Sequence, residues 1–276
     1  MHISIASKRA HTKHMHLLQK CIWSYNGCMS IRTCVGRTKE LIFEILFPPI
    51  CVGCTVYLPA TNRSPLCTEC ESSIPRNTSL RCPICETRLS TNRRICNHGH
   101  QNSIRFPYLL GAATNYENKT VQHIIHLCKY QKVHSLSDVC ARLLLEYMER
   151  LDPQPALLGM NPVVVPIPLH PKKERERGFN QSALIAQLFA HAKGLPYMEP
   201  LIKTRYDGPQ AKTKTHTERF TRMQGAFVIA DPSLVQNKNI ILIDDVSTSG
   251  ATLSEAAQTL KAAGAKQILA LVVAKA

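Results

Sequence analysis

The sequence predicts an α/β protein with a parallel sheet, preceded by a small cysteine-rich module. Two patterns indicate this: apolar strand-like runs alternate with amphipathic helical runs, and closely spaced Cys pairs come ahead of them. The 276 residues, 44% of them hydrophobic, suffice for one α/β domain and a smaller module. The formal net charge of +15 favours anionic partners such as nucleotides, pyrophosphate or nucleic acid. No apolar run is long enough to span a bilayer, which argues against an integral membrane protein.

The central strand of the sheet is predicted at Ile240 to Ile243, an unbroken apolar run typical of a parallel strand covered on both faces. Two acids, Asp244 and Asp245, follow at its carboxyl end. Adjacent carboxylates can accept hydrogen bonds from the vicinal hydroxyls of a ribose, or hold a divalent cation that does so. The plainer alternative is that the pair only caps the following helix. We favour the ribose interpretation because a second motif follows without a gap.

That second motif is a small, hydroxyl-rich turn before the helix-forming run Ser254 to Ala263. Free N–H groups at a helix start attract anions, glycine allows a close approach to the backbone, and hydroxyls add donors. The turn therefore predicts a phosphate site. Its residues are Ser247, Thr248, Ser249, Gly250, Ala251 and Thr252.

The Cys pairs predict two structural zinc sites. Pairs two residues apart form a knuckle turn, and the twelve residues between the first two pairs are typical of a zinc ribbon. Four-ligand sites leave no position for a catalytic water, so we expect both ions to stabilise the fold. The first site would use Cys51, Cys54, Cys67 and Cys70. The second would use Cys82, Cys85 and Cys96, with His98 or His100 as the fourth ligand.

Three segments follow from these patterns: an extension over 1–37, a double zinc ribbon over 38–105 and an α/β domain over 106–276. The extension is basic and lacks periodicity, so we interpret it as disordered or as a misassigned start, with Met29 as an alternative start before the amphipathic run Thr38 to Phe47. No signal peptide is evident, so zinc-bound Cys in a reducing cytoplasm is expected rather than disulfides.

The α/β domain is predicted to alternate strands and helices. We expect Cys128 and Cys140 to be buried thiols. The polar segment from Thr204 to Arg222 is predicted to be a mobile loop or a plain surface loop. Strands are expected at 109–113, 162–168, 226–229 and 267–273 in the parallel sheet, and helices at 121–127, 135–150, 181–193 and 251–263.

A cationic loop is predicted between the strand near Val163 and the helix starting at Gln181. Arg can contact phosphate through two N–H groups and Lys acts as a point charge, so this loop suits a pyrophosphate. For its first residues a solvated charge run is an equal alternative. The candidate ligands are Lys172, Arg175, Arg177, Gly178 and Asn180.

These motifs, in this order, resemble the ComF family: Cys pairs, "LCKY", "VVVPIPLH", "RERGFNQS", "GPQ", "RMQGAFVI" and "ILIDDVSTSGATL". The resemblance covers the chain from about Phe47 onward and implies a zinc ribbon fused to a type I phosphoribosyltransferase-like domain. It departs from the family where a His replaces the fourth Cys of the second cluster, and where Arg219 to Gln224 replaces a frequent Arg-x-x-Asn. In phosphoribosyltransferases a loop at the position of 204–222 closes over substrate, which makes Gln210 and Arg219 candidates for touching pyrophosphate.

The resemblance implies a Mg²⁺-dependent protein that binds phosphoribosyl pyrophosphate (PRPP) and transfers phosphoribose to a nitrogenous acceptor. Asp244 and Asp245 would orient the ribose diol. It also implies a link to competence or to the use of external DNA, with DNA-uptake proteins as partners. The alternative is a non-catalytic module that senses PRPP or a nucleotide. Aromatic residues are few and are not interleaved with the basic runs, so we expect only weak, nonspecific nucleic-acid binding.

Overall fold

The computed structural model describes residues 49–59, 61–62, 64–83, 85, 87–89, 107–130, 134–151, 161–206 and 221–276. All of these except Pro49 fall within one compact unit, Ile50–Ala276. Several sequence predictions concern positions outside the described residues: the extension 1–37, the start at Met29, the amphipathic run 38–47, Cys96, His98, His100, Gln210 and Arg219.

Four parallel strands form the central sheet in the order β1-β6-β5-β2. The strands are β1 (Leu109–Asn115), β2 (Val163–Pro166), β5 (Asn239–Ser247) and β6 (Gln267–Lys275). β5 and β6 lie in the middle and are buried along almost their whole length, as their continuous apolar sequences predict. Parallel pairing aligns the carboxyl ends of all four strands along one edge of the sheet.

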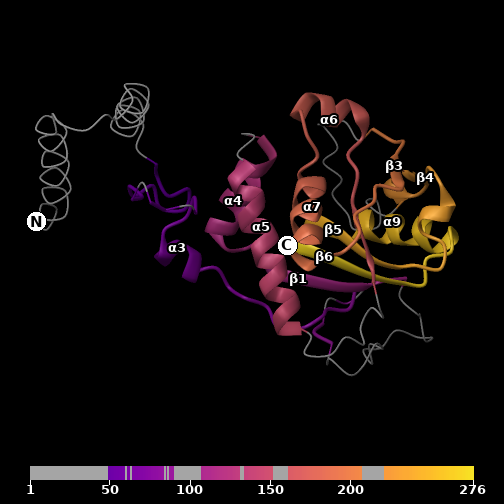
Figure 1. Cartoon of the computed structure of the whole chain (residues 1–276), viewed down its shortest axis with the longest axis horizontal. Helices are drawn as coiled ribbons and strands as arrows, with labels where there is room; N and C mark the ends of the chain where they lie inside the picture. Colours follow the sequence, from indigo (N-terminus) through magenta and orange to yellow (C-terminus); the bar gives the residue numbers. More distant parts are fainter. Residues whose placement is uncertain are drawn as a thin grey trace, which may run out of the picture. The chain divides into compact units, whose positions relative to one another are not determined.

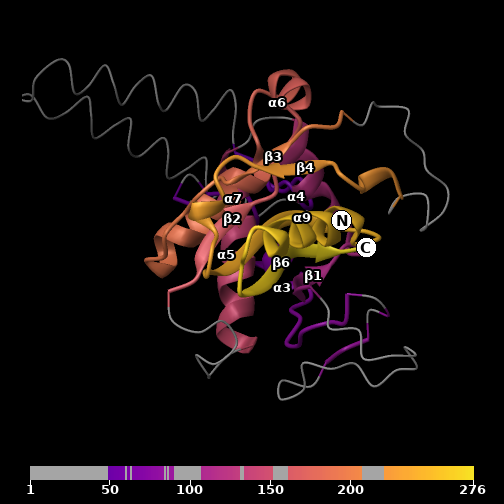
Figure 2. The same cartoon turned by 90° about the vertical axis from the view of Figure 1, so that its right-hand side faces the viewer.

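Helices cover both faces of this sheet (Figures 1 and 2). The helices α4 (Lys119–Tyr130), α5 (His134–Leu151) and α7 (Gln181–Lys193) pack on one face, and α9 (Ala251–Ala262) packs on the other. Alternate side chains of β5 pack on the two faces of the sheet. Ile241 and Ile243 belong to the core beneath α4, α5 and α7, whereas Ile240 and Leu242 belong to the core beneath α9. The predicted helices are thus present, as are the parallel strands predicted at 109–113, 162–168, 240–243 and 267–273, with ends shifted by a few residues.

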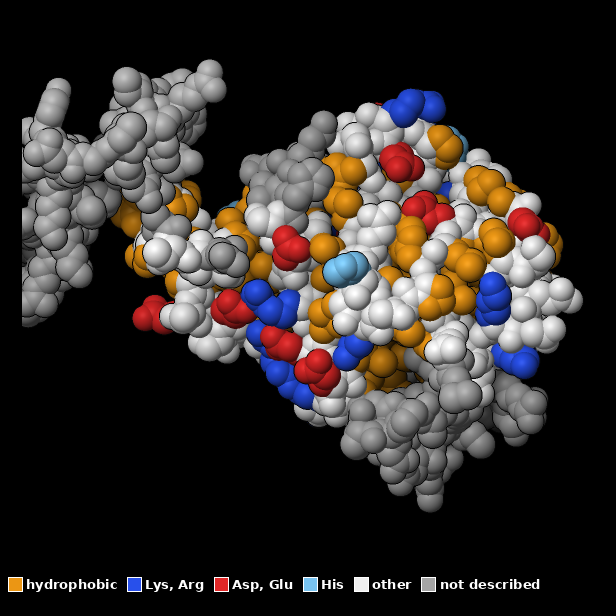
Figure 3. Space-filling view, in the orientation of Figure 1, with side chains coloured by type: hydrophobic (Ala, Val, Ile, Leu, Met, Phe, Trp, Pro, Cys, Tyr) orange, Lys and Arg blue, Asp and Glu red, His pale blue; other side chains and the backbone are white. Residues whose placement is uncertain are grey.

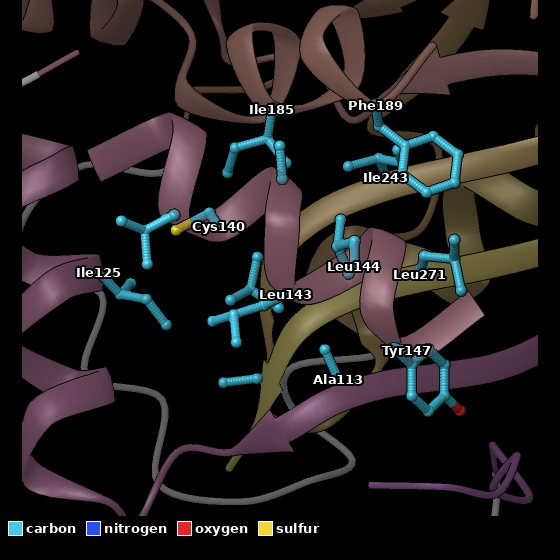
Figure 4. Close-up of a cluster of buried hydrophobic side chains, with 14 of the residues drawn as sticks. Ala113, Ile125, Cys140, Leu143, Leu144, Tyr147, Ile185, Phe189, Ile243 and Leu271 are labelled. Carbon is cyan, nitrogen blue, oxygen red and sulfur yellow. The ribbon is translucent and has the colours of Figure 1, made fainter. Parts of the chain in front are cut away.

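The larger core lies between the sheet and the three-helix layer (Figure 4). Tyr147 and Phe189 are its largest fully buried side chains, and each such side chain contributes about 1.5–3 kcal/mol by leaving water. Tyr147 lies over β1 because Gly111 has no side chain: a Cβ there would stand 2.7 Å from the Tyr147 ring. The Tyr147 hydroxyl donates a hydrogen bond to the Ser79 carbonyl at 2.8 Å, which ties α5 to the segment between the first cysteine cluster and Cys82. Cys128 and Cys140 are buried, as predicted.

Two predictions of local structure are wrong. The 226–229 strand does not join the parallel sheet: β4 (Phe227–Ile229) pairs antiparallel with β3 (Leu201–Lys203) as a separate two-stranded ribbon. The predicted cationic loop is largely a helix, α6 (Pro171–Arg177). Pro171 at its first turn, the His170 side chain as N-cap and left-handed Gly178 as C-cap explain why this short charged stretch is helical.

Two short helices complete the described part of the chain, α3 (Thr68–Ser72) beside the first cysteine pairs and η2 (Pro232–Leu234) before β5. None of the helices in this part of the chain combines the length and the apolarity needed to cross a membrane.

Candidate functional site

The acid pair lies at the carboxyl end of β5, where the sheet edge meets the start of α7. Asp244 is 9% exposed, and its Oδ1 accepts hydrogen bonds from the Ser182 hydroxyl at 2.8 Å and from the backbone N–H of Asp245 at 2.9 Å. Burial, and then the neighbouring charge of Asp245, raise the pKa of Asp244 to about 7. The pair therefore changes its charge near neutral pH.

Asp245 is held from two sides. Its Oδ1 forms an ion pair with Lys129 Nζ at 3.1 Å, and its Oδ2 accepts a hydrogen bond from Gln181 Nε2 at 2.9 Å. Gln181 in turn accepts a hydrogen bond from Arg177 Nη1 at 2.9 Å. These contacts link α4, α6 and α7 to the central strand.

Sequence reasoning missed Lys129, Gln181 and Ser182 as site residues. A signal for the last two existed, since they begin a helix just beyond the carboxyl end of β2, the strand beside β5. Lys129 lies in the motif "LCKY", but its partner could not be predicted from it, because α4 precedes β2 and β5 in the chain and only the folded packing brings its end to Asp245.

The predicted phosphate turn forms the start of α9. Gly250 has φ 75°, a left-handed conformation that favours glycine, and no side chain caps the helix N-terminus. The Ser247 hydroxyl is buried and has no hydrogen-bond partner among the described residues. A hollow of about 30 Å³ lies at this turn and is lined by Asp244, Val246 and residues 247–253. The backbone N–H groups of a helix start, a buried hydroxyl without a partner and a small hollow suit an anionic group such as a phosphate.

Two side chains outside the turn support it. Lys275, buried at the end of β6, donates from Nζ to the Thr248 carbonyl at 2.7 Å. The Tyr108 hydroxyl lies close to Gly250, at 3.3 Å from where a Cβ would stand. The turn is therefore fixed from the sheet and from the segment before β1.

The predicted pyrophosphate residues separate into different environments. Arg177, at the end of α6, approaches the acid pair through Gln181. Lys172 lies with Nζ 4.6 Å from the centre of the Tyr206 ring, and Arg175 is exposed. Asn180 is the buried N-cap of α7, with its side-chain oxygen accepting from Ser182 N and its amide donating to the Ile167 carbonyl. Asn180 thus shapes the backbone that presents Gln181 and Ser182.

The first cysteine cluster is assembled as predicted. The sulfur atoms of Cys51, Cys54, Cys67 and Cys70 all lie within 4.8 Å of one another. Burial of Cys51 opposes its ionisation, but hydrogen bonds from Cys67, Cys54 and Gly53 lower the pKa of its thiol to about 6. Gly53 must lack a side chain, because a Cβ there would stand 2.8 Å from Cys70 Sγ. Four thiols at this spacing fit a closed tetrahedral metal site, for which zinc is the usual ion.

The second cluster is described only in part. Cys82 is buried, and its Sγ accepts a hydrogen bond from the Cys85 backbone N–H at 3.5 Å, the contact expected of a knuckle turn. The other predicted ligands lie outside the described residues. The second zinc site stays a prediction.

Comparison with known proteins agrees with the resemblance seen in the motifs. Residues 181–276 match the family model of the phosphoribosyl transferase domain. The DNA utilization protein YhgH of Salmonella typhimurium is 26% identical over 222 residues, covering 80% of this chain and 94% of that protein. The competence protein ComFC of Streptococcus pneumoniae is 28% identical over 204 residues, covering 74% of this chain and 84% of that protein. ComFC of Bacillus subtilis is 40% identical over 98 residues, 36% of this chain and 38% of that protein.

Proposed function

We propose that this protein binds PRPP and acts as a Mg²⁺-dependent phosphoribosyltransferase. One observation carries the proposal: a single buried strand, β5, brings an acid pair and a small hollow at a helix start side by side, within the matched domain. Carboxylates suit the ribose hydroxyls and would repel a phosphate, whereas the turn suits the 5′-phosphate. The two features are thus complementary to neighbouring parts of one ligand.

In the proposed reaction, the lone pair of an acceptor nitrogen forms a bond to the anomeric carbon while the bond from that carbon to pyrophosphate breaks. Pyrophosphate leaves with the electron pair, and the acceptor nitrogen loses its proton. Asp244 would accept hydrogen bonds from the ribose diol, and Arg177 would offset the charge that develops on the leaving group. Mg²⁺, when bound with PRPP, would neutralise pyrophosphate oxygens.

The cysteine module would bind zinc as a structural element. Its four sulfurs supply all the ligands of a tetrahedral ion, so no position is left for a reacting water. Folding of the segment 50–70 would then depend on the metal, because few apolar side chains are buried there.

A second candidate function is a non-catalytic module that binds PRPP or a nucleotide and works with DNA-uptake proteins. The names of the relatives favour it, since they refer to competence and to DNA utilization. Direct DNA binding is less well supported. On the face drawn in Figure 3 the coloured Lys and Arg side chains are interspersed with Asp and Glu, and Arg76 and Arg142 pair with Glu146 and Glu71. A nucleic-acid surface would instead gather unpaired cations.

A thermal unfolding titration with PRPP and Mg²⁺ tests the proposal. A ligand at a hundredfold excess over its dissociation constant should stabilise the protein by about 2.7 kcal/mol. We expect a clear shift for the wild type and for Asp231→Ala, an exposed acid outside the site, and a lost shift for Asp245→Ala. Equal curves with and without PRPP would refute the proposal. Pyrophosphate release with a panel of nucleobases would then separate an enzyme from a sensor.

A further inference from the structure

The contact between Lys129 and Asp245 joins two separate parts of the chain. Lys129 belongs to the last turn of α4, outside the region matched to the phosphoribosyl transferase domain, whereas Asp245 belongs to the central strand. The two side chains are 22% and 8% exposed, and their charged atoms lie 3.1 Å apart. A pair this well shielded is stronger than a surface ion pair.

The contacts of the two acids differ. Both oxygens of Asp245 are engaged, one by Lys129 and the other by Gln181, and Asp245 does not line the hollow at the phosphate turn. Asp244 does line the hollow, and its hydrogen bonds from Ser182 and from the backbone of Asp245 both go to Oδ1. The geometry makes Asp244 the acid that faces a ligand and Asp245 the acid that is fixed within the protein.

We propose that Lys129 is a positioning residue, which clamps Asp245 against β5 and so keeps Asp244 aimed at the ribose hydroxyls. This inference rests on the proposed PRPP binding. Two adjacent carboxylates repel each other, and without a cation the pair would turn apart or take up a proton. The ammonium group of Lys129 offsets this repulsion through its ion pair with Asp245 Oδ1. Gln181 completes the clamp from α7 and connects it to Arg177.

Two other roles would give different results. If Lys129 contacted PRPP directly, its removal would weaken binding whether or not Asp245 carried a charge. If Lys129 blocked the site until ligand displaced it, its removal would tighten binding. A double-mutant cycle separates these cases from a clamp, because a residue that acts only through Asp245 has no effect once that partner is neutral.

The experiment measures PRPP affinity by calorimetry with Mg²⁺ for the full chain and for Lys129→Met, Lys129→Arg, Asp245→Asn and the double variant Lys129→Met/Asp245→Asn. We expect Lys129→Met to weaken binding by about tenfold or more, since a hydrogen bond to a shielded charge is lost. Lys129→Arg should stay within about threefold of the wild type because it restores the cation. The control Lys193→Met removes an exposed lysine paired with Glu149 at 3.5 Å and should leave affinity unchanged.

In the Asp245→Asn background, Lys129→Met should change affinity by less than about twofold. Equal effects in both backgrounds, or tighter binding by Lys129→Met, would overturn the proposal. The same proteins are also unfolded in urea without ligand, where a clamp predicts a coupling of about tenfold in the unfolding equilibrium between the two residues. If the wild type fails to bind PRPP, the proposed function is refuted. The double-mutant cycle measured by urea unfolding still tests the clamp, because additive effects of the Lys129 and Asp245 substitutions on stability would refute it.

Discussion

Replacing Asp244 with Asn should stabilise the protein against unfolding at alkaline pH but not at acidic pH. Asp244 has a pKa of about 7 in the folded protein, because of burial and the charge of Asp245, against 3.8 for an ordinary Asp. The stability contributed by its protonated form is therefore complete below about pH 4 and is lost as the pH rises through about 7. Asparagine has the shape of the protonated acid and takes no charge, so it escapes this loss.

The size of the effect follows from the difference in pKa. Roughly three units at about 1.4 kcal/mol each give an upper limit of about 4 kcal/mol, and we expect at least about 2 kcal/mol because Asp244 is well shielded from solvent. The hydrogen bonds are preserved, since the Asn oxygen can still accept from Ser182 and from the backbone N–H of Asp245. Titrating groups away from the acid pair and Lys129 are common to both proteins and cancel in the comparison.

Urea unfolding at 25 °C between pH 5 and pH 9, without PRPP or Mg²⁺, measures the difference directly. The free energy of unfolding of Asp244→Asn minus that of the wild type should rise from pH 5 to about pH 7, where the loss is nearly complete, and stay level above it. The control is Asp231→Asn. Hydrogen bonds from Ser233 lower the pKa of Asp231, so its stabilising effect is lost only as the pH falls through that lowered value. Its difference from wild type should be flat over this range; a flat difference for Asp244 as well would refute the reasoning.

Two further predictions concern the metal and the phosphate turn. Metal analysis of the full chain should give close to two zinc ions, and a value near one would mean that the Cys82 cluster holds none. The variant Cys54→Ser should lose the ion of the described cluster, whereas the control Cys140→Ala should keep both ions. The variant Gly250→Ala should lower the free energy of unfolding by about 1 kcal/mol, because the backbone there is left-handed, and should also weaken PRPP binding. The control Gly264→Ala changes a glycine with φ 91° at the other end of α9 and should lower stability alone. Equal PRPP affinity for the two glycine variants would argue against the turn as the phosphate site.

The parts of the fold that the sequence predicts well are those encoded by local patterns. Helix α7 starts and ends where its periodicity predicts, and Asn180 and Gly194 cap its two ends. The buried strand β5 was recognisable because a central parallel strand has no polar face. Strand β4 was assigned to the wrong sheet and β3 was not predicted, because strands of three residues are too short for a period to show and their partner cannot be read from the sequence.

In the candidate site, too, the residues that local patterns predict differ from those that depend on tertiary packing. Asp244, the turn after it and the first cysteine cluster follow from spacing within short segments, and the structure brings their residues together. The partners of the acids depend on how helices pack. Lys129 reaches Asp245 only because α4 covers the same face of the sheet as α7. The motif "LCKY" contains this lysine but does not indicate which residue it contacts. The charged stretch of α6 was predicted to be a loop because its many charges obscure the helix signal of its cap residues.

The position of β6 has a consequence for synthesis on the ribosome. β6 lies between β1 and β5, although it is the last strand of the chain. Strand β1 therefore waits until β6 has been synthesised before its neighbour in the sheet exists, and its apolar residues stay exposed meanwhile. A nascent chain that stalls before Gln267 would present unpaired sheet edges to chaperones and proteases, so the yield of folded protein should depend on whether β6 is reached.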